Sequence, residues 1–219
     1  MIQHVCRCAA SCPDISEVYV TTDDERIFQC VNDFGGKAVM TSREHLSGTD
    51  RIAEAVQKLD LGEDALIVNI QGDQPVFEPY LISDMIAPLI EDDSIPMSTL
   101  KYRITDRQEI ENRNIVKVVT DKDGFALYFS RHPIPFYRDP GSSSRHYKHL
   151  GFYAYRKDFL AKFSRLSMGR LEAAEKLEQL RALEHGFKIK VVETSSDSIE
   201  VDTPGDLKKV EEIIDRSYK

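Results

Sequence analysis

The segment that decides the fold runs from residue 65 to residue 75 and reads ALIVNIQGDQP. It begins as a continuous apolar run, which is typical of a strand buried on both faces of a sheet. The run ends at Gly72-Asp73, a turn that predicts one carboxylate at the C-terminal edge of this strand. Ligands bind at that edge in open α/β sheets, and a carboxylate there can hold a divalent metal for a phosphate-bearing substrate. An aspartate that caps the next helix fits the same pattern, so this segment alone leaves two interpretations open.

Strands and helices alternate through the first half of the chain. We expect strands at 17–22, 37–41 and 65–71, and helices at 2–10, 23–34, 49–59 and 78–90. Gly35-Gly36 ends the second helix, whereas the first helix begins without a visible cap. This order predicts a mostly parallel sheet covered by helices.

The second half of the chain is more mixed. We expect strands at 97–104, 116–120, 125–130, 150–156 and 189–192, and helices at 171–185 and 204–216. The sequence DKDG at 121–124 is a hairpin turn signal, and DPGSSSRHY at 139–147 is typical of a polar, flexible loop. The pattern predicts a single α/β domain, residues 1–219, in which a doubly wound sheet carries an antiparallel insertion of roughly 60–70 residues. Such an insertion often mediates the pairing of subunits.

Composition narrows the function. The chain of 219 residues is 41% hydrophobic and 30% charged, with a net charge of −8. This charge argues against a nucleic-acid partner but leaves room for a small anionic substrate bound by a local cluster of arginines and lysines. No apolar run approaches the ~20 residues that cross a membrane, and the first ten residues lack the apolar core of a signal peptide. We therefore expect a cytoplasmic protein with no membrane partner.

Four cysteines crowd into the first thirty residues, at Cys6, Cys8, Cys12 and Cys30. A metal site is one interpretation. The spacing lacks the paired C-x2-C motifs of a zinc site, however, and so favours free thiols that are partly packed in a helix.

A second acidic residue of interest follows a strand-like segment near the end of the chain, in the sequence VDTP at 201–204. Asp202 before Thr-Pro is a good helix N-cap, and this is the simpler interpretation. If Asp73 and Asp202 meet at one edge of the sheet, however, two hard oxygen ligands face one cavity. That arrangement suits Mg²⁺, which takes one or two carboxylates and leaves its other positions to water and phosphate oxygens. Whether the two residues meet is a question for the structure.

Several other polar residues are candidates, each with a simpler alternative. Ser47-Gly-Thr-Asp-Arg51 precedes a helix and can present amides, hydroxyls and one guanidinium to a ligand, or can form an ordinary capped start. Arg131 and Arg138 flank a stiff segment with two prolines. A lone His149 at the start of a strand is more often a satisfied histidine than a ligand. Glu178 and Gln179 lie within the expected long helix, where a charged pair usually belongs to the solvated face.

The order and the amino-acid sequences of these segments resemble those of one protein family. The resembling phrases are SGTDRIAEA (47–55), VNIQGDQP (68–75), NIVKVV (114–119), LYFSRHPIPF (127–136), HLGFYAYR (149–156), LEAAEKLEQLRALEHGFKIKVV (171–192) and VDTPGDL (201–207). They span nearly the whole chain and are similar to the 3-deoxy-manno-octulosonate (Kdo) cytidylyltransferases, or CMP-Kdo synthetases.

The resemblance implies a nucleotide-diphospho-sugar transferase-like, Rossmann-like fold and a defined reaction. CTP and the acid sugar Kdo give CMP-Kdo and pyrophosphate, for lipopolysaccharide assembly. The sugar C2 hydroxyl would attack the α-phosphorus in line, with Mg²⁺ stabilising the developing charge. A homodimer is also implied.

The resemblance also implies roles for individual residues. Asp73 and Asp202 are the implied catalytic Mg²⁺ ligands. The remaining residues are implied contacts to nucleotide or sugar: Ser47, Asp50, Arg51 and Gln71, and, in the Kdo pocket, Arg131, Arg138, His149, Tyr153, Glu178 and Gln179.

The chain departs from the family in two places. Members open with a buried strand and a loop rich in Gly, Arg and Lys, about 25–30 residues in all, which would precede Met1. We expect a misassigned start rather than a natural degenerate form. Gln74 stands where the family usually has Glu. Two alternatives stay open: a non-catalytic paralogue that binds a sugar acid, and an enzyme for a related acid sugar such as 8-amino-Kdo or a nonulosonic acid.

Overall fold

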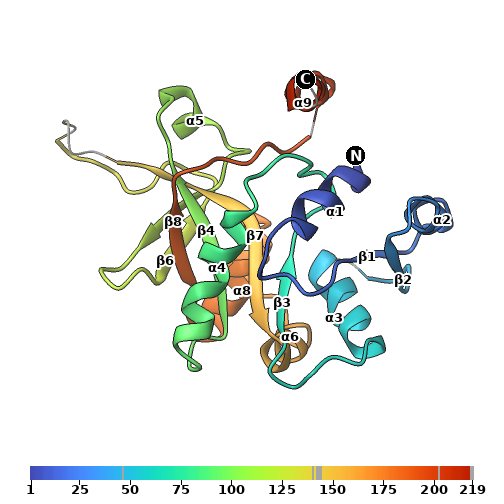
Figure 1. Ribbon diagram of the computed structural model, residues 1–219. Helices are drawn as coiled ribbons and strands as arrows, with labels where there is room; N and C mark the ends of the chain where they lie inside the picture. Colours follow the sequence, from blue (N-terminus) through green and yellow to red (C-terminus); the bar gives the residue numbers. More distant parts are fainter. Residues whose placement is uncertain (46, 140, 142–144, 202, 218–219) are drawn as a thin grey trace.

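The computed structural model describes residues 1–219 except residues 46, 140, 142–144, 202 and 218–219. Its strands lie in two sheets (Figure 1). In the smaller sheet, β1 (Tyr19–Thr22) and β2 (Lys37–Met40) pair in parallel. The larger sheet contains β3 (Leu66–Asn69), β4 (Met97–Arg103), β5 (Lys117–Thr120), β6 (Ala126–Ser130), β7 (Tyr147–Arg156) and β8 (Lys190–Thr194).

The larger sheet has the strand order β6-β5-β7-β4-β8, and β3 pairs with β7. β3, β4, β5 and β8 run in one direction, whereas β6 and β7 run against them. The predicted α/β class is confirmed, and the antiparallel strands come from the part of the chain predicted as an insertion. β7 lies between β3 and β4, so the insertion contributes a strand to the centre of the sheet.

The helices cover the sheets. They are α1 (Ile2–Ala10), α2 (Glu25–Asp33), α3 (Gly48–Lys58), α4 (Tyr80–Glu91), α5 (Arg107–Glu111), α6 (Lys157–Phe163), α7 (Arg170–Glu175), α8 (Gln179–Glu184) and α9 (Pro204–Ser217). Local signals set several ends. The carboxylate of Asp24 accepts a hydrogen bond from Arg26 N and so caps α2, and Gly35, at φ +78°, ends that helix.

The long helix expected at 171–185 is wrong, because the segment forms two short helices. Lys176 adopts the left-handed conformation, with φ 54° and ψ 46°, and separates α7 from α8. Lysine is a good helix former, so nothing local predicts this break. Tertiary contacts hold it: Leu177 is buried, and the buried side chains of Glu172 and Arg181 pair across the break.

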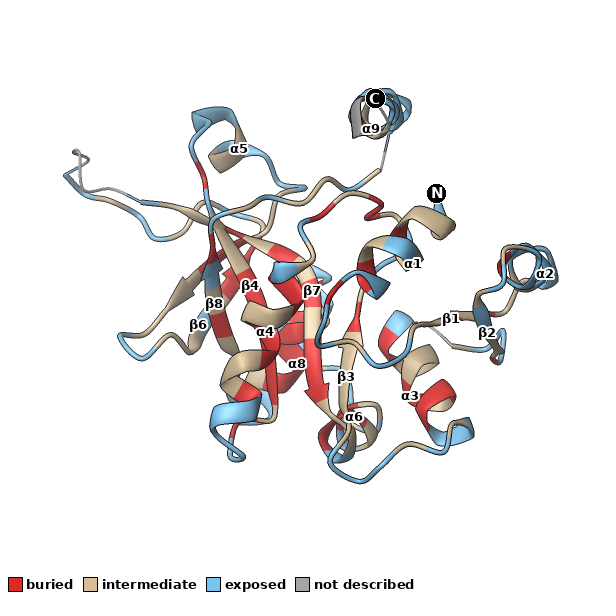
Figure 2. Ribbon diagram, viewed as in Figure 1, coloured by how far each residue is buried: buried red, intermediate tan, exposed pale blue. Residues whose placement is uncertain are grey.

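The core lies on both faces of the sheet, and β7 separates its two halves. Leu150, Phe152 and Ala154 pack with α1 and α4 on one face. Tyr153 and Tyr155 point to the other face, toward α3, α6 and α8. Figure 2 shows buried residues concentrated in the central strands and in the helix surfaces turned toward them. β3 also packs on both faces, as its apolar run predicts.

Candidate active site

The turn at Asp73 lies against the segment 195–201, which leads from β8 to α9 and which we call the strap. Val201 N donates to Asp73 O at 2.9 Å, and Ile199 N donates to Val76 O at 3.5 Å. Val76 and Ile199 form an antiparallel bridge. The strap therefore brings the VDTP sequence to the C-terminal end of β3. Asp202 lies outside the described residues, and it directly follows Val201 in the sequence.

Two side chains also anchor the strap. The Tyr80 hydroxyl at the start of α4 bonds to Ser195 Oγ at 3.1 Å and to Ser196 Oγ. Lys148 Nζ on β7 binds Asp197 at 2.6 Å and Glu109, on α5, at 3.0 Å. Burial alone would lower the pKa of Lys148, but the two carboxylates outweigh it and raise the pKa. The ammonium therefore stays charged and connects the strap to the insertion.

A buried amide joins the strap to the Asp73 turn. Gln74 is 0% exposed, and its Nε2 donates to Glu200 Oε1 at 2.7 Å. Gly151 on β7 lies beneath this pair: a Cβ there would be 3.3 Å from Glu200 Oε1 and 3.4 Å from Gln74 Nε2. Position 74, where the family usually has Glu, therefore carries an amide in this chain, and this amide pairs with a carboxylate on the strap.

The start of α3 reaches the same edge of the sheet. Ser47 caps α3 by accepting a hydrogen bond from Asp50 N at 3.1 Å, and a Cβ at Gly48 would lie 3.6 Å from Gln71 Nε2. The Thr49 hydroxyl donates to Glu178 Oε2 at 2.5 Å. The structure thus brings three separate candidate segments together: the start of α3, the end of β3 and the start of α8.

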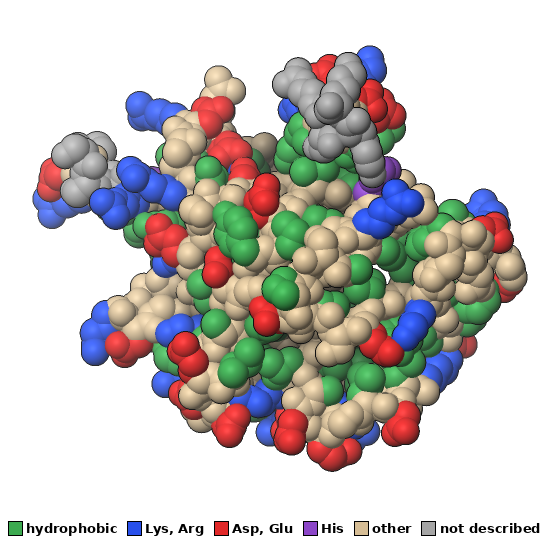
Figure 3. Space-filling model, viewed as in Figure 1, with side chains coloured by type: hydrophobic (Ala, Val, Ile, Leu, Met, Phe, Trp, Pro, Cys, Tyr) green, Lys and Arg blue, Asp and Glu red, His purple; other side chains and the backbone are tan. Residues whose placement is uncertain are grey.

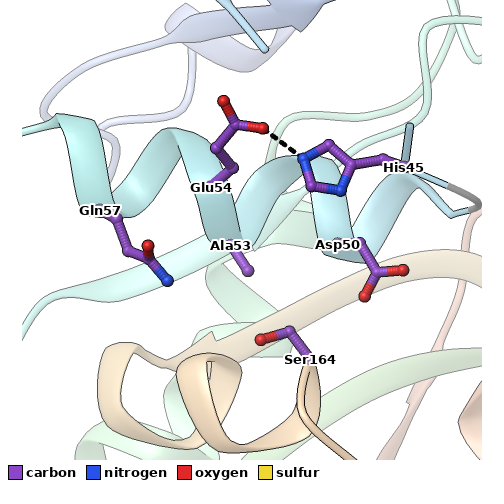
Figure 4. A pocket seen from close by; sticks show the side chains of 6 residues that line it. All are labelled: His45, Asp50, Ala53, Glu54, Gln57 and Ser164. Atoms are coloured by element: carbon purple, nitrogen blue, oxygen red, sulfur yellow. Dashed lines mark hydrogen bonds and ion pairs between the residues drawn. The ribbon is translucent and has the colours of Figure 1, made fainter. Parts of the chain in front are cut away.

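Asp50 and Arg51 lie elsewhere. Asp50 lines a cavity of about 280 Å³ with His45, Ala53, Glu54, Gln57 and Ser164, in which His45 pairs with Glu54 (Figure 4). The Arg51 guanidinium binds Thr41 Oγ1 at 2.7 Å and Asp23 at 3.2 Å, so it ties α3 to the small sheet. Within the described residues, neither side chain forms a hydrogen bond or ion pair with the Asp73 turn.

His149 and Tyr153 lie next to each other, with their ring planes tilted by 48°, on the face of β7 that points toward α8. Their ring centroids are 5.3 Å apart, and His149 also packs edge-on against Phe129. His149 Nε2 bonds to Thr99 Oγ1 at 2.9 Å. Burial lowers the pKa of His149 to about 3 and raises that of Tyr153 well above its usual value, with Tyr155, Glu178 and Glu200 adding to the latter. Both side chains are therefore neutral at physiological pH.

Glu178 and Gln179 lie at the break between α7 and α8, not on a solvated helix face. Gln179 is buried, and Glu178 approaches Arg181 Nη2 at 3.5 Å. Arg181 in turn makes two hydrogen bonds to the Glu172 carboxylate, at 2.6 and 2.8 Å. This buried pair fixes the turn that directs Glu178 toward Thr49.

The two candidate arginines differ. Arg131 is held in place: its Nε donates to Glu175 O at 2.8 Å and its Nη1 to Arg113 O at 3.1 Å. Arg138 is exposed on the arm formed by residues 131–139 and 145–146, which projects from the body (Figure 1). Figure 3 shows Lys and Arg side chains gathered on this arm. The structure does not place Arg138 beside the Asp73 turn.

The assembled edge carries a carboxylate at Asp73, an exposed amide at Gln71 and the Tyr153 and His149 rings, whereas the amides of Asn69 and Gln74 are buried. Hard oxygens and hydrogen-bonding groups of this kind suit a hydroxylated ligand and a divalent cation. Lys148, Gly151 and Glu200 belong to this site but are not selected from the sequence. For Glu200 a signal existed, because it directly precedes the VDTP sequence.

Other predictions can be checked in the described part of the chain. All four cysteines are free thiols, as expected. In that part, no cluster of three or more His, Cys, Asp and Glu side chains could hold a metal, and no helix is long and apolar enough to cross a membrane.

Comparisons with known proteins identify the same family of cytidylyltransferases. A family model described as cytidylyltransferase matches residues 1–190. A 3-deoxy-manno-octulosonate cytidylyltransferase of Syntrophus aciditrophicus (strain SB) is 54% identical over 214 residues, which cover 98% of this chain and 86% of the relative. The 3-deoxy-manno-octulosonate cytidylyltransferase 2 of Hydrogenovibrio crunogenus (strain DSM 25203 / XCL-2) is 53% identical over 221 residues, which cover 100% of this chain and 89% of the relative.

Solved structures agree. A CMP:2-keto-3-deoxy-manno-octonic acid synthetase complexed with CTP is 40% identical with a TM-score of 0.92, and the match covers 99% of this chain and 88% of that one. A 4-diphosphocytidyl-2C-methyl-D-erythritol synthase from Anaerococcus prevotii DSM 20548 is 15% identical with a TM-score of 0.62. That match covers 98% of this chain and 88% of the other, and it reflects the fold alone.

Proposed function

This chain belongs to the 3-deoxy-manno-octulosonate cytidylyltransferase family, and on that premise we propose that it transfers the cytidylyl group of CTP to Kdo. The observation that carries the proposal is the hydrogen bond from Val201 N to Asp73 O, because it brings two distant phrases shared with the family to one edge of the sheet. The reaction forms CMP-Kdo and releases pyrophosphate.

We assign the chemistry to in-line displacement. The C2 hydroxyl oxygen of the sugar forms a bond to the α-phosphorus, the bond from that phosphorus to the β-phosphate oxygen breaks, and the hydroxyl proton passes to solvent. No covalent enzyme intermediate is needed. Gln71 and the start of α3 are proposed to orient the nucleotide. Tyr153, His149, Glu178 and Gln179 are proposed to bind sugar hydroxyls, and Arg131 the sugar carboxylate.

Mg²⁺ is the proposed cofactor, and the residues present fit it. Asp73 supplies a hard oxygen at the edge where the strap ends, and the next residue after the strap is Asp202. These two carboxylates are the proposed ligands. The ion would neutralise charge on the phosphates as the displacement proceeds.

The deciding experiment incubates the protein with CTP, Kdo and Mg²⁺ and measures pyrophosphate release. Release that depends on all three supports the proposal, and 8-amino-Kdo and a nonulosonic acid serve as parallel substrates. Binding of Kdo without turnover, observed by calorimetry, would instead indicate a paralogue that binds the sugar acid.

We further propose a homodimer and a cytoplasmic location. The projecting arm carries Phe136, which is 89% exposed, and such an apolar side chain is a suitable anchor for a second copy. Four free thiols fit a reducing compartment. Sedimentation of the protein and of Phe136→Ser tests the dimer, which the substitution should weaken. We also propose that residues 1–219 form a single nucleotidyltransferase domain.

A further inference from the structure

We propose that the Gln74–Glu200 pair is the positioning element that seats the end of the strap on the Asp73 turn. The pair requires one amide and one carboxylate, whichever side carries each. The link from this pair to catalysis rests on the function proposed above, whereas its role in seating the strap can be measured without any substrate.

The contact itself is well suited to this role. It joins residues 126 positions apart, and its donor comes from a side chain that is 0% exposed. A hydrogen bond to an ionised acceptor is stronger than one between neutral groups, and a buried one is little weakened by water. Glu200 is therefore held by a fully buried side chain of the turn.

Backbone hydrogen bonds and one ion pair also hold the strap near this pair. Ile199 N lies 3.5 Å from Val76 O, a long and therefore weak hydrogen bond. Lys148 anchors the strap at Asp197, three residues before Glu200. Val201 N donates a backbone hydrogen bond to Asp73 O at 2.9 Å. The shortest of these contacts at the end of the strap is the side-chain pair, at 2.7 Å.

Gly151 explains how the pair fits. Because β7 passes directly beneath, a Cβ at this position would come within 3.4 Å of both side chains. The pair therefore has little freedom to move toward the sheet. Two carboxylates in this space would repel each other, and the strap can relieve that repulsion by moving away from the turn.

The test swaps the amide and the carboxylate between positions 74 and 200. We compare the unchanged protein with Gln74→Glu, Glu200→Gln and the double variant under one set of conditions. Deuterium exchange at the Val201 and Ile199 amides measures how firmly the strap is seated. Gln108→Glu and Glu211→Gln make the same chemical changes at exposed positions of α5 and α9 and serve as controls.

We expect Gln74→Glu to speed exchange at Val201 by about tenfold or more, and the double variant to return to within about twofold of the unchanged protein. Additive effects of the two substitutions would overturn the proposal, as would an equal acceleration in the controls. Pyrophosphate release is measured on the same samples. If the variants show the expected rates of deuterium exchange but no sample forms CMP-Kdo, the proposed function fails and the positioning role stands.

Discussion

Val201 N donates a hydrogen bond to Asp73 O at 2.9 Å, although the two residues are far apart in the sequence. This contact brings a strand-end aspartate to the segment that carries a second aspartate. In the sequence each aspartate is a candidate helix cap, but the N-cap of α4 is Pro79, so Asp73 does not cap that helix. Asp202 directly follows Val201 in the sequence, and the two aspartates are the ligands proposed above for a cation.

Asp73 is the first residue to test. Asp73→Asn keeps the size of the side chain and leaves the backbone carbonyl that binds Val201 unchanged. We expect kcat/KM for CMP-Kdo formation to fall by about 100-fold or more, because a proposed metal ligand loses its charge. Pyrophosphate release measured against Mg²⁺ concentration checks this. An unchanged rate at every Mg²⁺ concentration would rule out Asp73 as a ligand.

His149 makes stability depend on pH. Its folded pKa is lowered to about 3 by burial, whereas an unfolded histidine titrates near 6.5. The unfolded state therefore binds more protons between these values, so the contribution is fully present above pH 6.5 and is lost as pH falls toward 3. We expect the free energy of unfolding to fall by about 1.4 kcal/mol more in the unchanged protein than in His149→Gln between pH 7.5 and 5.5.

Urea unfolding at the two pH values measures this difference. Gln is chosen because its amide can replace the bond to Thr99 without titrating. Equal pH dependence in the two proteins would show that His149 is not neutral and buried.

The Glu172–Arg181 pair should be a large contributor to the shape of the α7–α8 turn. Both side chains are less than 10% exposed, so removing one leaves a buried charge. We expect Arg181→Met to lower the free energy of unfolding by about 3–5 kcal/mol, and Glu172→Met/Arg181→Met to lower it by less. Chemical unfolding of the single and double variants checks both values. A double variant less stable than Arg181→Met would contradict this account.

Lys148 should keep the strap resistant to proteolysis. Lys148→Met leaves Asp197 and Glu109 facing each other, and we expect local opening to become easier by about 1 kcal/mol, which raises the open fraction about fivefold. A protease specific for glutamate reports this opening, because Glu193 and Glu200 flank Asp197. Lys208→Met, at an exposed position of α9, is the matched control. Equal cleavage rates in both variants would show that Lys148 does not anchor the strap.

Local patterns predicted the elements well, for physical reasons that lie within each segment. The apolar run before Gly72 forms β3, the DKDG turn joins β5 to β6, and Asp24 and Ser47 cap their helices. Each depends on side-chain periodicity or on a cap that bonds within a few residues. The break at Lys176 was missed because its causes, a buried leucine and a buried ion pair, act between segments.

The α/β class, the family and most candidate residues can be predicted from the sequence, since each depends on short segments of adjacent residues. Which candidate residues contact one another is seen only in the tertiary structure. It joined Asp73 to the strap, Thr49 to Glu178 and Gln74 to Glu200, and it held Asp50 and Arg51 in other contacts. The reason is that contacts between distant segments depend on the packing of the whole sheet, which no single phrase encodes.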